Sequence, residues 1–256
     1  MNSQLKKVSA TTKRRILGVD FFVGSGPEAV RRGLSARLVV VPAAPALVDL
    51  PMDAGYREAL EQADLVLTDS GFMVLLWRLL TGERLERVSG YRYLQLLLAE
   101  TELRQPGAVF WVMPSTAARD RNLGWLRAQG FVCDESDCYI APFYRSAGVT
   151  DPQLCAMLAM RKPRHVVICI GGGTQEKLGL HLARNCPGPI AFHCIGAAMG
   201  FLSGDQVRIP EWADSWFLGW AFRCLADPRR LVPRYLKAFR LAGLMRQYRH
   251  LAPTAL

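Results

Sequence analysis

Short apolar runs, each followed by a turn and then by a helical pattern, recur along most of this chain. The runs are rich in β-branched residues and lack the strict polar–apolar alternation of a strand with one wet face. Such runs are typical of strands that helices cover on both faces. The predicted strands are Ile16–Val23, Leu38–Val41, Leu65–Leu67, Val109–Met113, His165–Ile170 and Ile190–Ile195. Their alternation with helices predicts an α/β fold with a doubly wound, mostly parallel sheet.

The end of the chain differs from the rest, because the strand pattern stops after Pro210. Two helical stretches follow, near 213–225 and 229–248, and the second mixes Leu and aromatic residues with Arg and Lys. This composition suits either a helix that lies in a membrane interface or a C-terminal helix with a solvated basic face. The predicted helices before this point lie near 27–36, 53–63, 72–81, 91–103, 116–129, 151–160 and 175–185.

The formal net charge of +10 is concentrated at the two ends of the chain. Residues 1–15 contribute +5 and residues 220–256 contribute +7, so the intervening body sums to −2. A nucleic-acid partner is not expected, because such binders carry their positive charge on the folded face that docks. Positive charge that is confined to the chain ends is typical either of a solubilising tail or of a segment that binds an anionic bilayer surface.

The seven cysteines and four histidines show no metal or redox spacing. No two cysteines have the two-residue spacing of a zinc knuckle, so we predict neither a metal site nor a cofactor. The sequence shows no signal-peptide core and no run of eighteen apolar residues. We expect a cytoplasmic protein that is peripheral to a membrane.

Four segments are candidate sites. Three are turns after predicted strands, where ligands of open parallel sheets bind, and the fourth lies between two predicted helices. The turn Gly24-Ser25-Gly26 resembles the start of a dinucleotide fingerprint, but Ala29 replaces its third glycine and no acidic residue ends the next strand. A plain strand-to-helix turn is therefore favoured there over an oxidoreductase site. The basic turn Arg84–Gly90, taken alone, reads as a solvated loop.

Asp69 and the glycines at 171–173 are the stronger candidates. Asp69 follows the strand Leu65–Leu67 and precedes a helix that starts near Gly71, so it is either a helix cap or an ionised carboxylate that can accept a proton. Gly171, Gly172 and Gly173 let backbone N–H groups approach a phosphate, although a plain turn is the alternative. The Lys-Ser/Thr pair of an NTP-hydrolysing loop is missing.

In order along the chain, these segments resemble the WecG/TagA/CpsF glycosyltransferase family from about Ile16 to Leu236. The matching segments are Ala63-Asp64-Leu65-Val66-Leu67-Thr68-Asp69-Ser70-Gly71, Arg87-Val88-Ser89-Gly90, Gly171-Gly172-Gly173-Thr174-Gln175-Glu176, Gly196-Ala197-Ala198-Met199-Gly200-Phe201-Leu202-Ser203-Gly204, Arg208-Ile209-Pro210-Glu211-Trp212, Trp220-Ala221-Phe222-Arg223 and Pro228-Arg229-Arg230-Leu231-Val232-Pro233-Arg234-Tyr235-Leu236. The last two segments form one tail motif, so six motifs occur in one order, which is a specific signal of kinship.

The resemblance implies a bacterial enzyme with a Rossmann-like sheet, which moves a sugar from a UDP-sugar to a polyprenyl-diphosphate-linked saccharide and inverts the anomeric centre. The resemblance implies that the sugar is a hexose or an N-acetylhexosamine. Asp69 would be the catalytic base, and Arg87 and Gln175 would line the sugar and diphosphate. The other substrate-binding positions implied or predicted are Gly71, Gly171, Gly172, Gly173, Glu176, Gly196, Arg223, Arg229, Arg230 and Arg234. No Asp-x-Asp triplet occurs in the chain, so arginines are expected to replace a metal.

The chain departs from the family pattern at four places. Val41-Pro42-Ala43 stands where the family has Thr-x-Asn, Gly173-Thr174 replaces Pro-Lys, and Gly200 and Gly219 replace acidic residues. The alternative is therefore a catalytically weak or inactive relative that binds a sugar nucleotide or lipid-linked glycan within a biosynthetic complex.

Three segments are expected: a basic N-terminal arm over residues 1–15, a catalytic domain over 16–210 and a membrane-association appendage over 211–256. The resemblance implies that the tail holds the enzyme on the inner face of the plasma membrane. The oligomeric state is left open, a homo-oligomer included.

Overall fold

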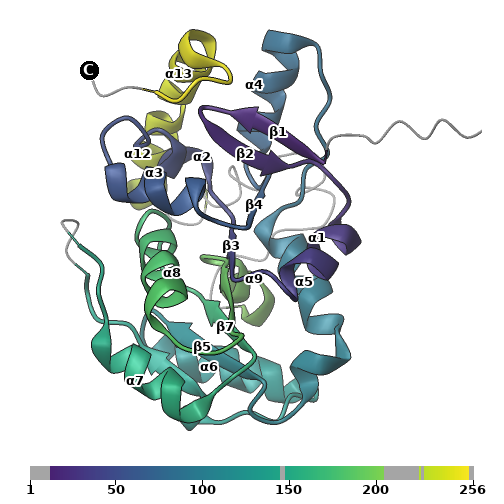
Figure 1. The fold of residues 1–256 in the computed structure, drawn as a ribbon, viewed down its shortest axis with the longest axis vertical. Coiled ribbons are helices and arrows are strands. Elements are labelled where there is room, and N and C mark those ends of the chain that lie inside the picture. Colours follow the sequence, from purple (N-terminus) through teal and green to yellow (C-terminus); the bar gives the residue numbers. More distant parts are fainter. Residues whose placement is uncertain (1–11, 145–147, 205–224, 226–227, 254–256) are drawn as a thin grey trace, which may run out of the picture.

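A computed structural model describes residues 12–144, 148–204, 225 and 228–253 of the chain (Figure 1). Within these residues, one sheet has eight strands in the order β1-β2-β4-β3-β8-β7-β5-β6. The strands are β1 (Lys13–Ile16), β2 (Val19–Phe22), β3 (Leu38–Val40), β4 (Leu65–Leu67), β5 (Val109–Met113), β6 (Cys138–Ile140), β7 (His165–Ile168) and β8 (Ala191–Cys194). All neighbouring pairs are parallel except β1 with β2. The predicted doubly wound, mostly parallel sheet is thus confirmed.

The two edge strands differ from expectation. The segment 16–23 was expected to be one strand, but the chain turns back at Leu17 and Gly18, whose φ angles are 49° and 80°. Residues 13–15, assigned to the basic arm, therefore belong to β1. In that strand Arg14 pairs with Glu83, and the Arg15 and Asp20 side chains approach to 3.6 Å. At the opposite edge β6 has only three residues, too few for a periodic signal.

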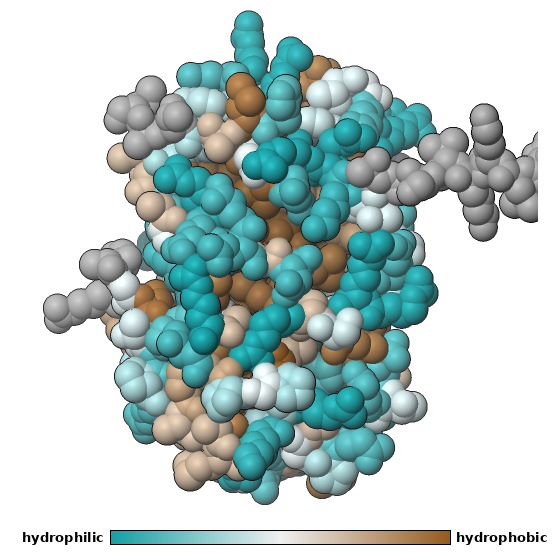
Figure 2. All heavy atoms as spheres, in the orientation of Figure 1, coloured by the Kyte–Doolittle hydropathy of each residue, from teal (hydrophilic) through white to brown (hydrophobic). Residues whose placement is uncertain are grey.

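Helices cover both faces of the sheet, and each face has its own hydrophobic core. One face is covered by α2 (Ala44–Leu47), α3 (Ala54–Glu61), α4 (Gly71–Thr81), α7 (Pro152–Arg161), α8 (Thr174–Asn185) and the C-terminal helices. The other is covered by α1 (Gly26–Gly33), α5 (Gly90–Ala99), α6 (Thr116–Ala128) and α9 (Ala198–Ser203). Figure 2 shows hydrophilic side chains over most of one side of the molecule, with hydrophobic atoms gathered near its middle.

The stretch 229–248 forms two helices instead of the expected one, α12 (Pro228–Ala238) and α13 (Arg240–Tyr248). Their apolar residues Leu241 and Met245 are fully buried in the core beside α2 and α4. The Lys237 ammonium bonds to Asp49 at 2.6 Å. Figure 1 shows the pair of helices beside α2 and α3, near the β1–β2 hairpin. The helix expected near 213–225 falls outside the described residues, apart from Leu225.

Among the residues that the structure describes, no helix is long and apolar enough to cross a membrane.

Candidate functional site

The carboxyl ends of four adjacent parallel strands, β4, β3, β8 and β7, bring the predicted site residues to one edge of the sheet. The two halves of the sheet meet where β3 lies beside β8. Crevices at such junctions are the usual ligand sites of open α/β sheets.

At the end of β4, Thr68 fixes the basic loop that precedes α5. The Thr68 side chain is fully buried. Its hydroxyl donates to the Glu86 carbonyl at 2.7 Å and accepts from the Val88 N–H at 3.2 Å. The turn Arg84–Gly90, which taken alone was interpreted as a solvated loop, is therefore hydrogen-bonded to the end of β4.

Asp69 lies next, at the start of two helices. Its Oδ1 atom accepts a hydrogen bond from the backbone N–H of Gly90, the first residue of α5, at 2.9 Å. The adjacent Ser70 caps α4 by accepting from the Met73 N–H at 3.1 Å. Because both helix N-termini carry partial positive charge, they favour the ionised carboxylate. Asp69 is partly exposed, so a ligand hydroxyl can approach it.

Arg87 is tied to the same strand end. Its Nε atom donates to the Asp69 carbonyl at 2.8 Å, and the side chain is partly exposed. The structure thus brings the predicted catalytic residues Asp69 and Arg87 together, with Gly71 in the first turn of α4.

The glycine-rich turn after β7 opens α8 as predicted. Gly173 has a φ of 89°, which favours glycine, and it is the N-cap of α8. The buried Glu176 carboxylate accepts from the Gly173 N–H at 2.6 Å, as in a capping box. Gly171 is exposed and Gly172 is partly exposed, so this turn reaches solvent.

Gln175 links this turn to the end of β8. Its Oε1 atom accepts from the Gly196 N–H at 2.6 Å, and its Nε2 atom donates to Glu176 Oε1 at 3.0 Å. Both side chains are buried, at 2% and 0% exposure. In this structure they bond to the protein itself, so their contact with a substrate stays a prediction.

The Asp69–Arg87 pair after β4 and the glycine turn after β7 lie on one edge of the sheet but are not in direct contact. Strands β3 and β8 separate β4 from β7, which places their ends about 14 Å apart at the usual strand spacing. The start of α5 occupies part of the gap, because a Cβ on Gly90 would lie 3.0 Å from Val41 Cγ1 and 3.6 Å from the Ile195 carbonyl. A ligand that reaches both groups must therefore be extended.

The predicted arginines of the tail are only partly described. Arg223 lies outside the described residues. Arg229 is exposed at the start of α12. Arg230 and Arg234 fall within α12, but their side chains lie outside the described part, so a role for them at the site stays a prediction.

Two buried residues near the site were not singled out from the sequence. Cys194 ends β8, and its thiol donates to the Gln175 carbonyl at 3.2 Å. Tyr56 on α3 is fully buried, and its pKa is raised by burial and by the negative charges of Glu176, Asp49 and Asp53. Neither residue has a sequence signal of function, because small or aromatic residues in apolar patterns read as core.

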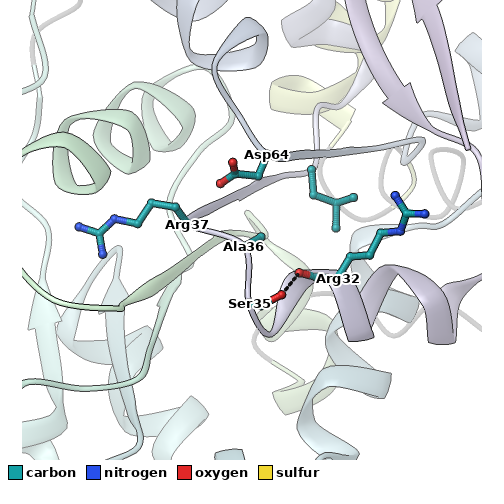
Figure 3. A pocket seen from close by; sticks show the side chains of 6 residues that line it. Arg32, Ser35, Ala36, Arg37 and Asp64 are labelled. Atoms are coloured by element: carbon teal, nitrogen blue, oxygen red, sulfur yellow. Dashed lines mark hydrogen bonds between the residues drawn. The ribbon is translucent and has the colours of Figure 1, made fainter.

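A separate hollow of about 370 Å³ lies at the amino ends of β3 and β4, away from this edge (Figure 3). Its charged groups already have partners. Arg37 donates to the carbonyls of Ala183, Gly188 and Ile190, and Asp64 accepts from the Leu38 N–H at 2.9 Å. The hollow therefore adds nothing to the candidate site.

Over the described part of the chain, no group of three or more His, Cys, Asp or Glu side chains could hold a metal ion. The turn at Gly24 is a plain strand-to-helix turn, in which Ser25 caps α1 and Pro27 lies in its first turn.

Comparison with known proteins gives one family. A search of curated proteins finds no match to the chain. The model of the family described as "Glycosyl transferase WecG/TagA/CpsF family" matches residues 14–253, nearly the whole sequence. The match includes every motif on which the resemblance rests, together with both candidate strand ends described above. The chain therefore belongs to the WecG/TagA/CpsF family of glycosyltransferases.

Proposed function

We propose that this chain is an inverting, metal-independent glycosyltransferase that moves a sugar from a UDP-sugar to a saccharide linked to polyprenyl diphosphate. Its family is that of glycosyltransferases in cell-surface polysaccharide synthesis, with a nucleotide-sugar donor and a glycan acceptor. The observation that carries the finer proposal is the position of Asp69, partly exposed at a strand end, beside Arg87 and at the N-termini of two helices.

In the proposed reaction Asp69 takes the proton of the acceptor hydroxyl while that oxygen attacks the anomeric carbon. The new glycosidic C–O bond forms on the face opposite UDP as the bond to the UDP oxygen breaks, so the anomeric configuration inverts. A well-placed general base of this kind contributes a factor of about 10² to 10⁴ in rate.

The departing UDP gains negative charge on its diphosphate, and donors must stabilise that charge. Arg87 and the exposed glycine turn at Gly171 supply donors on the two sides of the edge, and Arg229 supplies a cation from α12. Guanidinium groups and backbone N–H groups can do at a diphosphate what a metal does in other transferases.

The lipid-linked acceptor implies contact with a membrane, and the C-terminal helices are the proposed contact. Leu225, Leu236 and Phe239 are 81%, 60% and 61% exposed, and Arg229 and Arg240 are exposed among them. Exposed apolar side chains interspersed with arginine suit the interface of an anionic bilayer.

A non-catalytic relative that binds a sugar nucleotide is the second candidate. It is favoured by the end of β3, where the chain places Val41 and Pro42, both buried, instead of the polar residues of the family pattern. A site that lacks these polar groups can hold a nucleotide without orienting its sugar for attack.

A thermal-shift screen against a panel of UDP-sugars, followed by transfer assays on lipid-linked saccharides in anionic liposomes, separates the two candidates. A raised melting temperature with transfer supports the enzyme, because a ligand that binds the native state stabilises it. A raised melting temperature without transfer across the panel supports the binding protein. The absence of any shift contradicts both candidates.

A further inference from the structure

Two cysteines that are distant in sequence lie in contact on the face of the sheet that α7 and α8 cover. Cys155 is in α7, and Cys186 directly follows the last residue of α8. Their Sγ atoms are 3.3 Å apart. A disulfide bond measures about 2.05 Å, so the two sulfurs need to approach by little more than 1 Å to be joined.

A histidine completes the cluster. The Nε2 atom of His181 lies 3.8 Å from Cys155 Sγ. The amide nitrogen of Asn185 donates to the His181 carbonyl at 2.7 Å and lies 3.2 Å from His181 Nδ1. Because a carbonyl can only accept, the donor group of Asn185 faces Nδ1. Nδ1 therefore accepts from the amide, and in the neutral ring the proton sits on Nε2, toward the Cys155 sulfur.

The two thiols differ in their surroundings. Burial and the hydrogen bond to Cys155 raise the pKa of Cys186 to about 12, so Cys186 keeps its proton and donates it toward the neighbouring sulfur. Cys155 thus receives an S–H from Cys186 and an N–H from His181. It is also partly exposed, whereas Cys186 is buried. These contacts make Cys155 the reactive sulfur and Cys186 the resolving one.

The backbone around Cys186, after the end of α8, is held by Arg37. Arg37 donates to the carbonyl of Cys186 and to those of Gly188 and Ile190, at 2.6 Å and 3.0 Å for the latter two. The end of α8 is therefore fixed against the strand that Arg37 precedes.

We propose that Cys155 and Cys186 are a redox modification site, at which a hydroperoxide converts the two thiols reversibly into a disulfide that links α7 to the end of α8. The Cys155 thiolate attacks one peroxide oxygen, so an S–O bond forms, the O–O bond breaks, and the alcohol or water leaves with a proton. The Cys186 sulfur then attacks the sulfenic sulfur and forms the S–S bond, while the S–O bond breaks and water leaves with the Cys186 proton. Two thiols are oxidised by two electrons in all, and one peroxide is reduced.

The test is thiol mapping of the full chain. The reduced protein is treated with hydrogen peroxide, denatured, alkylated and analysed by intact mass and peptide mapping, with and without dithiothreitol. Of the seven cysteines, five should remain alkylatable after oxidation, and one cross-linked peptide pair should contain Cys155 and Cys186. Dithiothreitol should restore all seven. Full alkylation after peroxide, or a cross-link between other cysteines, overturns the proposal.

Three variants assign the roles. Cys186→Ser should leave Cys155 as a sulfenic acid that dimedone traps, whereas Cys133→Ser, which removes the other partly exposed cysteine of the described residues, should keep the cross-link. His181→Gln should slow oxidation, because the ring N–H that faces the Cys155 sulfur is lost. Dimedone labelling that is equal at Cys133 and Cys155 in the Cys186→Ser protein contradicts the assignment of Cys155.

Discussion

The Oδ1 atom of Asp69 lies 2.9 Å from the backbone nitrogen of Gly90, and this contact joins the end of β4 to the start of α5. This hydrogen bond holds the carboxylate at the N-terminus of a second helix in addition to α4, which begins two residues later. The carboxylate is thus oriented by the backbone, and its partial exposure leaves it accessible to an acceptor hydroxyl.

Replacement of Arg87 by lysine tests the guanidinium donors that are proposed to face the diphosphate, because the positive charge is retained. Arg87→Lys keeps a positive charge but loses the Nε donor that bonds to the Asp69 carbonyl. We expect kcat to fall about 100-fold, as for the loss of one transition-state donor. Arg92→Lys, an exposed position on α5, is the matched control and should transfer sugar at the wild-type rate. Equal rates for the two variants would remove Arg87 from the site.

Gln175→Ala tests the buried link between the turn after β7 and the end of β8. The variant leaves the Gly196 N–H and one Glu176 oxygen without their hydrogen bonds to the side chain of Gln175. We expect the free energy of unfolding to fall by about 1–3 kcal/mol, measured by urea denaturation. Gln62→Ala removes an exposed amide that bonds to Arg184, and it should change the free energy of unfolding by less than about 0.5 kcal/mol. A Gln175→Ala protein as stable as wild type would show that the link is not structural.

Gly33 and Tyr93 make a close contact that a methyl group would break. A Cβ on Gly33 would lie 2.1 Å from the Tyr93 hydroxyl oxygen. Gly33→Ala should therefore destabilise the protein by about 1–3 kcal/mol, as overpacked cores do. In the Tyr93→Phe background the same change should cost less, because the clashing oxygen is absent. A double-mutant cycle by thermal denaturation measures the difference, and additive effects would refute the contact.

The stability of the protein should fall in mild acid because of two buried histidines. His193 Nδ1 lies 3.0 Å from the Tyr93 hydroxyl, His193 Nε2 lies 3.1 Å from His165 Nδ1, and His165 Nε2 lies 3.1 Å from Glu102. Burial lowers the pKa of His193 to about 3, and burial also lowers the pKa of His165. Both histidines are therefore neutral in the folded chain at pH values where the unfolded chain protonates them.

The sign of the effect follows from proton uptake. Below about pH 6.5 the unfolded chain binds protons that the folded chain does not, so stability falls as pH falls, by up to about 1.4 kcal/mol per pH unit for each histidine. Urea denaturation between about pH 7.5 and about pH 5 measures the slope. The double variant His165→Gln/His193→Asn should flatten it. An equal slope in the wild type and the double variant would contradict the account.

The strands of this fold were predictable where apolar runs are buried on both faces, as at Val109–Met113, which is β5 with the same bounds. The β1–β2 hairpin was not, because its edge strand consists mostly of basic residues and its turn depends on the left-handed conformation of Leu17 and Gly18. The short helix α9 and the break between α12 and α13 have no periodic signal long enough to predict them.

The sequence predicted which residues of the candidate site occur at strand ends, but it did not predict their hydrogen-bond partners. The bond from Gly90 to Asp69 spans 21 positions, and its partners are set by how α5 packs beside β3 and β8. Gln175 was expected to line the sugar and diphosphate because the resemblance to the family implied it. Its inward orientation depends on Gly196, whose N–H lies 21 residues further along the chain.

The most direct test of the account compares Asp69→Asn with Asp64→Asn, two carboxylates that flank β4. In each variant the amide oxygen can keep the observed hydrogen bond, from the Gly90 N–H in one and from the Leu38 N–H in the other, so both proteins should fold. Sugar transfer from the UDP-sugar that the screen identifies should fall by a factor of about 10² to 10⁴ in Asp69→Asn, with donor binding retained, and stay at the wild-type rate in Asp64→Asn. A folded Asp69→Asn protein that transfers sugar at the wild-type rate would contradict the assignment of Asp69 as the base.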